Sequence, residues 1–259
     1  VRVVTDVDIY EDPKESPSFK QLEKAGIKVV SGNPNAIMHD KFVVVDGGAV
    51  WMGSWNFTTN DTYRYNNNGA IIYSSRLASN YTVVFEKMFV NNLFGAKRKG
   101  GGTTSKLTIN GVNVENYFAS DDEVTTAIVN RLKQAKTSIS FMAFSFTEDE
   151  IGKAMMDRMK AGVKVRGVFE NTGSQTQFSE FKGLKAAGAD VLTDGNPYLM
   201  HHKVIIIDSQ TVIFGSFNFS ANAQDDNDEN LLIVDDAVMA RAFLDEFDRV
   251  YAQAKNPPK

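Results

Sequence analysis

The sequence predicts an α/β fold made of two similar halves, and three observations support this prediction. One motif is written twice, at residues 38–56 and 200–218, with its two leading histidines 162 positions apart. The residues that precede each motif also resemble each other, so the repeat extends over a larger unit in each half. The short apolar runs VVVD and VIIID inside the motifs are rich in β-branched residues, which is typical of strands buried on both faces.

The elements of each half follow in order from the apolar pattern. The run VRVVTD at residues 1–6 predicts a strand, and FKQLEKAGIKVV at residues 19–30 predicts a helix followed by a second strand. The motif then supplies further strands, and an amphipathic helix near residues 81–94 closes the half. The second half repeats this order from VRGVFE at residues 165–170 to an amphipathic helix over about residues 237–252.

The second half has an opening portion without a counterpart in the first half. Helices with one apolar face are predicted to begin near Val124 and Ile151, on either side of the apolar strand SISFMAFSF at residues 138–146. Nothing equivalent precedes Val1. We therefore expect that a segment upstream of Val1, or another chain, completes the first half.

A stretch rich in glycine and basic residues, GAKRKGGGTTS, separates the halves and is typical of a flexible linker. We therefore divide the chain into a first half at residues 1–94, a linker at residues 95–106 and a second half at residues 107–259. The dipeptide Asn110-Gly111, just after the linker, favours a two-residue hairpin turn.

The composition argues against several classes of protein. Of the 259 residues, 42% are hydrophobic and 23% are charged, which is ordinary for a globular chain. The net charge of −4 counts against a non-specific binder of nucleic acid, although it does not describe the charge inside a cleft. The sequence has no cysteine, no apolar run of membrane-spanning length and no metal-ligand spacing of His, Asp and Glu. We therefore predict no disulfide, no stable membrane insertion and no metal or other cofactor.

Each motif places a histidine and a lysine two residues apart. Side chains alternate faces along a strand, so His39 and Lys41 are predicted to share one face, as are His201 and Lys203. Lysine supplies positive charge, and histidine can attack or carry a proton near neutral pH. The pairing suits an anionic ligand, and two copies allow one histidine to attack phosphorus while the other protonates the leaving oxygen.

The remaining motif residues receive different predicted roles. Neutral side chains of the Gly-Ser-x-Asn part are predicted to bind phosphoryl oxygens: Ser54, Asn56, Ser216 and Asn218. Asp46 and Asp208 fall on the opposite strand face from the lysines and are predicted to brace the following turn. His202 stands where the first half has Asp40, and we predict that it is a bystander.

One position outside the motifs distinguishes the halves. Glu229 and Asn67 occupy equivalent positions after the two motifs. A carboxylate hydrogen-bonded to an imidazole raises the pKa of the imidazole and favours its protonated form. We therefore predict that Glu229 pairs with His201 and makes it the general acid, whereas His39, backed by neutral Asn67, is the nucleophile. The alternative is that Glu229 is a solvated residue at the start of a strand.

The spacing H-x-K-x4-D-x6-G-S-x-N, present twice, resembles the signature of the phospholipase D superfamily, and the resemblance covers nearly the whole chain. It implies two similar mixed-sheet α/β halves related by a pseudo-two-fold axis, with one active site at their interface. It also implies metal-independent phosphodiester cleavage through a phosphohistidine, with His39 and His201 as the catalytic pair. The implied phosphate-binding residues are Lys41, Lys203, Asn56 and Asn218, assisted by Ser54 and Ser216.

The residues after each motif bear on the substrate. GSWNFTTND and GSFNFSANA resemble the small bacterial endonucleases of the superfamily, whereas its lipid synthases tend to show Asp and Arg-Ser after the asparagine. We therefore expect a nuclease acting on DNA or RNA. The alternatives are a phospholipase D or transphosphatidylase acting on lipid headgroups, and a scaffold that binds a phosphodiester without cleaving it. The lack of cysteine and the likeness to small nucleases favour a secreted or periplasmic bacterial protein.

Overall fold

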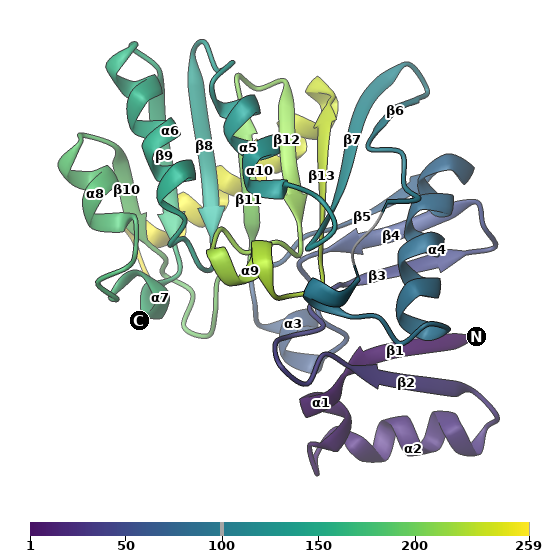
Figure 1. The fold of residues 1–259 in the computed structure, drawn as a ribbon. Coiled ribbons are helices and arrows are strands. Elements are labelled where there is room, and N and C mark those ends of the chain that lie inside the picture. The colour runs from purple at the N-terminus through teal and green to yellow at the C-terminus, as the bar shows by residue number, and fades with distance from the viewer. Residues whose placement is uncertain (99–100, 259) are drawn as a thin grey trace.

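Two groups of strands meet at a shared interface in the computed structural model, which describes residues 1–98 and 101–258 (Figure 1). The strands of the first half are β1 (Arg2–Asp6), β2 (Lys28–Gly32), β3 (Phe42–Val45), β4 (Ala49–Gly53) and β5 (Gly69–Tyr73). The strands of the second half are β6 (Lys106–Ile109), β7 (Val112–Ala119), β8 (Ser138–Ala143), β9 (Lys164–Phe169), β10 (Asp190–Thr193), β11 (Lys203–Ile207), β12 (Thr211–Gly215) and β13 (Glu229–Asp235).

The helices cover these sheets and connect them. The first half contains α1 (Val7–Glu11), α2 (Ser16–Lys24), α3 (Thr59–Tyr63), α4 (Ser75–Phe89) and the short 3₁₀ turn η1 (Gly95–Lys97). The second half contains α5 (Val124–Leu132), α6 (Asp149–Lys160), α7 (Asn171–Ser174), α8 (Phe181–Ala186), α9 (Ala221–Asp225) and α10 (Ala237–Lys255). None of the described helices is long and apolar enough to cross a bilayer.

The strand pairings confirm the predicted α/β class with mixed sheets. The second half forms one eight-stranded sheet in the order β10-β9-β8-β11-β12-β13-β7-β6, in which β8, β9 and β10 run parallel and the other pairs are antiparallel. The first half repeats part of this order as the parallel pair β1-β2 and the antiparallel sheet β3-β4-β5. The predicted hairpin turn lies between β6 and β7, with positive φ at Asn110 and Gly111.

Helix boundaries follow from capping side chains and apolar faces. The predicted helix near residues 81–94 begins earlier, at Ser75, because the Ser74 side chain accepts a hydrogen bond from the Leu77 backbone. Helix α10 begins at Ala237 for the same reason, with Asp236 as its cap. Both helices bury one face, and Figure 1 shows α10 behind the eight-stranded sheet, with α5 and α6 on its opposite side.

One hydrophobic core joins the two halves. Val50, Met52 and Tyr81 of the first half belong to the same buried cluster as Val212 and Phe214 of the second half. A separate cluster lies on the α5 and α6 side of the large sheet. Burial of the shared cluster fixes the relative position of the halves, since apolar burial contributes roughly 25 cal/mol per Å².

The predicted linker is only partly a linker. Gly95–Lys97 form η1, the Gly95 N–H donates to an Asp228 carboxylate oxygen at 2.8 Å, and Arg98 has no exposed side-chain surface. A charged side chain is fully buried only when it is paired, and Arg98 lies among carboxylates. Residues 95–98 therefore belong to the packed interface, while residues 99 and 100 of the predicted linker lie outside the described residues.

Candidate active site

Two backbone hydrogen bonds between the halves hold the motif histidines at the interface. The N–H of His39 donates to the carbonyl of Asp228 at 3.0 Å, and the N–H of His201 donates to the carbonyl of Asn66 at 2.9 Å. Asp228 and Asn66 occupy equivalent positions, so the two hydrogen bonds repeat each other across the pseudo-two-fold axis. Each histidine therefore lies beside a segment that follows the motif of the opposite half.

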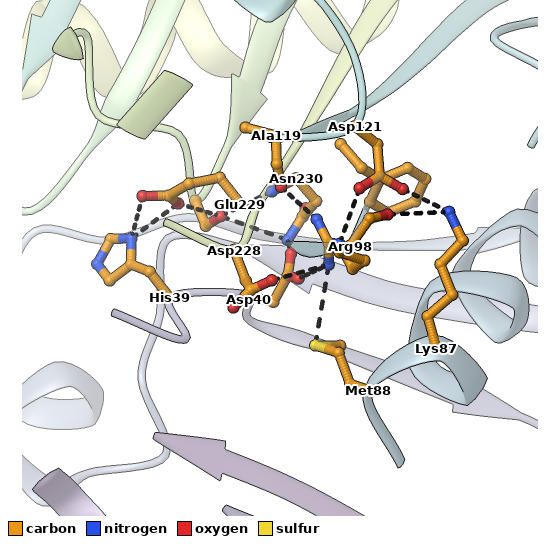
Figure 2. A network of polar contacts seen from close by, with 12 residues as sticks. His39, Asp40, Lys87, Met88, Arg98, Ala119, Asp121, Asp228, Glu229 and Asn230 are labelled. Carbon is orange, nitrogen blue, oxygen red and sulfur yellow. Dashed lines mark hydrogen bonds and ion pairs between the residues drawn. The ribbon is translucent and has the colours of Figure 1, made fainter. Parts of the chain in front are cut away.

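Glu229 is the side-chain partner of His39. Both carboxylate oxygens of Glu229 lie 2.8 Å from His39 Nδ1 (Figure 2). The carboxylate is fully buried and also accepts hydrogen bonds from Ser216 Oγ at 2.6 Å and Asn227 Nδ2 at 3.3 Å. The prediction that Glu229 pairs with His201 is wrong, because the backbone hydrogen bond places it beside the histidine of the other half.

His201 has neutral partners and a carboxylate slightly further away. Its Nδ1 lies 3.1 Å from Asn67 Oδ1, 3.1 Å from the Ser54 carbonyl oxygen and 3.4 Å from Asp61 Oδ1. A carbonyl oxygen can only accept a hydrogen bond, so Nδ1 of His201 carries a proton. Asp61 is a site residue that sequence reasoning missed. Aligning the halves could have found it, because the second half has Ala223 at the equivalent position. The structure adds that Asp61 is buried.

Both rings direct their second nitrogen away from protein partners. Among the described residues, all hydrogen bonds made by the two imidazole rings involve Nδ1. Donation from Nδ1 leaves Nε2 as the nitrogen that can meet a substrate. The two rings are also close enough for His39 to influence the pKa of His201.

The two lysines share this pocket with the histidines. Lys41 Nζ donates to the carbonyl of His39 at 2.7 Å, and Lys203 Nζ donates to the carbonyl of His201 at 2.9 Å. Burial lowers the pKa of Lys41 to about 8, and burial together with the charge of Lys41 lowers the pKa of Lys203 well below its usual value. Four basic groups thus converge at one place, where a bound anion would favour their protonated forms.

Burial also controls the two imidazoles. Burial and the charges of Lys41 and Lys203 lower the pKa of His39 well below its usual value. Burial and Lys203 lower the pKa of His201 to about 3. Burial raises the pKa of Glu229 to about 7, against the opposing effect of Lys41. A bound phosphodiester anion would favour the protonated forms of the two imidazoles.

The motif serines hold the histidine partners. Both are fully buried, and Ser216 Oγ donates to Glu229 while Ser54 Oγ lies 2.9 Å from Asn67 Oδ1. Each hydroxyl also accepts a hydrogen bond from a backbone N–H. This arrangement differs from the predicted contact with phosphate, because the hydroxyls are already occupied below the surface of the site.

The motif asparagines differ between the halves. Asn56 Nδ2 donates to Asp61 Oδ1 at 3.1 Å. Among the described residues, the buried Oδ1 of Asn218 has no hydrogen-bond partner. Asn56 is therefore held in place, whereas Asn218 has unused hydrogen-bonding capacity.

A second polar layer lies behind the histidines. Asn230 Nδ2 donates to Asp40 at 2.8 Å, and the equivalent Asn68 contacts His202 Nδ1 at 2.9 Å. His202 is fully buried and also contacts Glu246 at 3.0 Å. His202 thus has a structural role behind the site, while its predicted lack of a part in catalysis stays a prediction.

Figure 2 shows how Arg98 extends this layer behind His39 and Glu229. The guanidinium lies 3.2 Å from Asp40, 3.1 Å from Asp121 and 3.4 Å from Asp228, and it also donates to the Ala119 carbonyl. One arginine therefore joins carboxylates from both halves.

The motif aspartates lie away from the pocket. Asp208 accepts backbone hydrogen bonds from Lys136, Thr137 and Ser138, at 2.7 to 2.9 Å, and so holds the start of β8. Asp46 is exposed in a turn with φ of 49°. Within residues 1–98 and 101–258, no group of three or more His, Cys, Asp or Glu side chains could hold a metal ion.

The chain is similar in sequence to known proteins. The chain is 35% identical over 132 residues to "Phospholipase D" from Rickettsia prowazekii and 33% identical over 138 residues to "Mitochondrial cardiolipin hydrolase" from Homo sapiens. These matches cover 51% and 53% of this chain, and 64% and 54% of the relatives. The chain thus spans less than two thirds of the length of these relatives.

Solved structures show the same architecture. Nuc, a phospholipase D family member from Salmonella typhimurium, matches with a TM-score of 0.52 and 31% identity over 55% of this chain and 95% of that protein. Phosphatidylserine synthase from Haemophilus influenzae matches 98% of this chain and 74% of that protein with a TM-score of 0.71, and at 12% identity it shows the fold alone. The model of the family described as "Cardiolipin synthase, PLD-like domain" matches residues 1–89 and 128–251. Because that match covers most of the chain, the protein belongs to the phospholipase D superfamily.

Proposed function

We propose that this protein is a metal-independent phosphodiesterase, and that it is a nuclease that cleaves DNA or RNA through a covalent phosphohistidine. The observation that carries the proposal is the pair of imidazoles at the interface, each with its Nδ1 occupied by protein acceptors and its Nε2 left for a substrate. Two buried lysines beside them supply the positive charge that a phosphodiester needs.

In the first step, His39 Nε2 attacks phosphorus, a P–N bond forms and the bond to the leaving alcohol breaks. Glu229 supports this role because its carboxylate accepts a hydrogen bond from the Nδ1–H group of His39, leaves the lone pair on Nε2 and offsets the charge that develops on the phosphorylated ring. His201 transfers its Nε2 proton to the leaving oxygen. His39 is therefore the nucleophile, because a carboxylate contacts its Nδ1 directly.

In the second step, water attacks the phosphohistidine. His201, now neutral at Nε2, removes a proton from the water while the P–N bond breaks and His39 is released. Lys41 and Lys203 stabilise the charge on the non-bridging oxygens in both steps, and the Nδ2 group of Asn218 donates a hydrogen bond to the same oxygens.

Aromatic and basic side chains next to the pocket support a nucleic acid substrate. The ring of Tyr65 lies 6.4 Å from that of His201, and the Arg64 guanidinium lies 5.2 Å from the centre of the Tyr198 ring. Tyr63 is 82% exposed and Tyr198 57% exposed. Exposed rings beside a cation suit the stacking of bases and contact with the backbone of a single strand. The motif tails, which resemble small endonucleases, point the same way.

Cleavage of a phospholipid headgroup is the second candidate, because the relatives carry the names phospholipase D and cardiolipin hydrolase. To separate the two, the protein is incubated in EDTA with single-stranded DNA, plasmid, RNA, and vesicles of phosphatidylcholine or cardiolipin. We expect nucleic acid cleavage that EDTA does not prevent. Release of headgroups without cleavage of any nucleic acid would overturn the nuclease assignment.

The covalent step has its own test. Rapid quenching during turnover, followed by peptide mapping, should locate the phosphoryl group on His39, and His39→Ala should abolish the adduct. An adduct on His201 would reverse the two roles. Activity lost in EDTA and restored by magnesium would contradict the metal-free scheme.

A further inference from the structure

Each imidazole has one buried carboxylate nearby, but the two halves supply it from different positions. In the second half, position 229 is Glu and position 223 is Ala. In the first half, the equivalent position 67 is Asn and position 61 is Asp. The second half thus has its acid at the start of a strand, β13, whereas the first half has it in the first turn of a short helix, α3.

Asp61 is held firmly in that place. Its backbone N–H donates to Thr58 Oγ1 at 3.1 Å, and Thr58 Oγ1 donates to Asp61 Oδ2 at 2.7 Å. The other carboxylate oxygen, Oδ1, accepts from Asn56 N and Nδ2 at 3.1 Å and from Asn67 Nδ2 at 3.0 Å. The residue is 5% exposed. Its orientation is therefore set by protein contacts before any substrate arrives.

Asn67 links this carboxylate to His201. Its Nδ2 donates to Asp61 Oδ1, while its Oδ1 accepts from His201 Nδ1 at 3.1 Å. Asp61 Oδ1 itself lies 3.4 Å from His201 Nδ1. The Asp61 carboxylate thus acts on His201 through the Asn67 amide and through a contact of 3.4 Å, whereas the Glu229 carboxylate contacts His39 directly.

The charges around His201 show why such a carboxylate matters. Lys203, two residues further along the chain, and Lys41 and His39 from the first half all oppose its protonation. Asp61 is the favourable charge among these neighbours. Although burial opposes it, interactions with His201, Thr58 and Asn56 lower the pKa of Asp61 to about 2, so the carboxylate is ionised at neutral pH.

We propose that Asp61 is a positioning residue that, together with Asn67, holds His201 and gives it the proton affinity that a general acid requires. This inference rests on the proposed function, in which His201 protonates the leaving oxygen. It assigns the two carboxylates different tasks: Glu229 supports the phosphorylated ring, and Asp61 supports the ring that delivers and removes protons.

The leaving group provides the sharpest test. A dinucleotide needs a proton on its leaving oxygen, whereas a p-nitrophenyl phosphodiester does not, because nitrophenolate is stable as an anion. We measure kcat/KM, which reports the steps up to the phosphoenzyme. Asp61→Ala should reduce kcat/KM on the dinucleotide on the order of 100-fold and on the nitrophenyl ester by less than about threefold.

The pH profile supplies a second readout. Removing Asp61 removes a charge that favours protonated His201, so the alkaline limb of the dinucleotide profile should move to lower pH. The double variant Asp61→Ala/Asn67→Glu gives the first half the arrangement of the second, with Ala at 61 and Glu at 67. It should recover most of the dinucleotide activity and return the limb toward its original pH.

Two controls make the result decisive. Asp225→Ala removes a carboxylate from an exposed position of α9, the helix equivalent to α3, and should leave kcat/KM unchanged on both substrates. Thermal melting shows whether each variant is folded. Equal losses on both substrates with an unmoved pH profile would overturn this inference while leaving the phosphohistidine mechanism intact. If the native protein cleaves neither substrate, the proposed function itself fails.

Discussion

The two halves use equivalent strands for the site but bury them differently. In the second half, β11 and β13 are buried on both faces, and Ile205 and Ile233 have no exposed surface. Their equivalents in the first half, Val43 and Ile71, are 39% and 59% exposed. The strands β3 and β5 alternate between more and less buried residues, which is the pattern of a sheet covered on one face.

The difference arises from the portion that only the second half contains. Strand β8 pairs with β11, and α5 and α6 cover the outer face of the sheet. Among the described residues, no strand pairs with the corresponding edge of β3. The site nevertheless has both histidines in equivalent backbone contacts. Its geometry therefore depends on the interface between the halves and not on the outer face.

The largest expected effect concerns the unequal partners of the two histidines. Glu229→Gln should lower kcat on the order of 10³-fold or more, because the amide cannot offset positive charge on the phosphorylated ring of His39. Asn67→Ala should lower kcat by only about tenfold, since Asp61 and the Ser54 carbonyl remain near His201. Steady-state kinetics checks both values, and equal losses would mean that the halves are functionally symmetric.

The layer behind the two histidines gives the next prediction. Arg98→Met leaves buried carboxylates without their shared cation, so the free energy of unfolding should fall by about 3–5 kcal/mol. His202→Gln keeps one hydrogen-bonding group between Asn68 and Glu246, so the free energy of unfolding should fall by only about 1–3 kcal/mol. Urea unfolding measures both, and a larger loss for His202→Gln would contradict this order.

The motif aspartates offer a matched pair on the outer side. Asp208→Ala removes the acceptor for three backbone N–H groups ahead of β8 and should cost about 1–2 kcal/mol. Asp46→Ala alters an exposed side chain and should leave the unfolding midpoint of this chain unchanged. A clear loss for Asp46→Ala would show that this aspartate has a partner that these contacts do not include.

The smallest expected effect is local. Backbone amides of β3 should exchange with deuterium faster than those of β11, because β3 lacks the neighbour that β8 provides to β11. Hydrogen exchange followed by mass spectrometry checks this prediction, and equal protection of β3 and β11 would contradict it.

The repeat made much of the fold predictable. VVVD and VIIID marked β3 and β11 because β-branched runs favour strands, and the helix that closes the second half was predicted within a few residues. The linker prediction missed the packed residues 95–98, because composition does not show which charges are paired. Arg98 lies in a stretch that reads as flexible, but carboxylates of both halves surround it.

The sequence by itself determined the duplicated motif, the order of strands and helices, and the residue types that suit phosphoryl chemistry. Only the tertiary structure decided which carboxylate serves which imidazole. The residues that meet, such as His39 and Glu229, are 190 positions apart and are brought together by backbone hydrogen bonds between the halves. A repeat shows which positions are equivalent, but contact across a pseudo-two-fold axis depends on how the shared core orients the two copies.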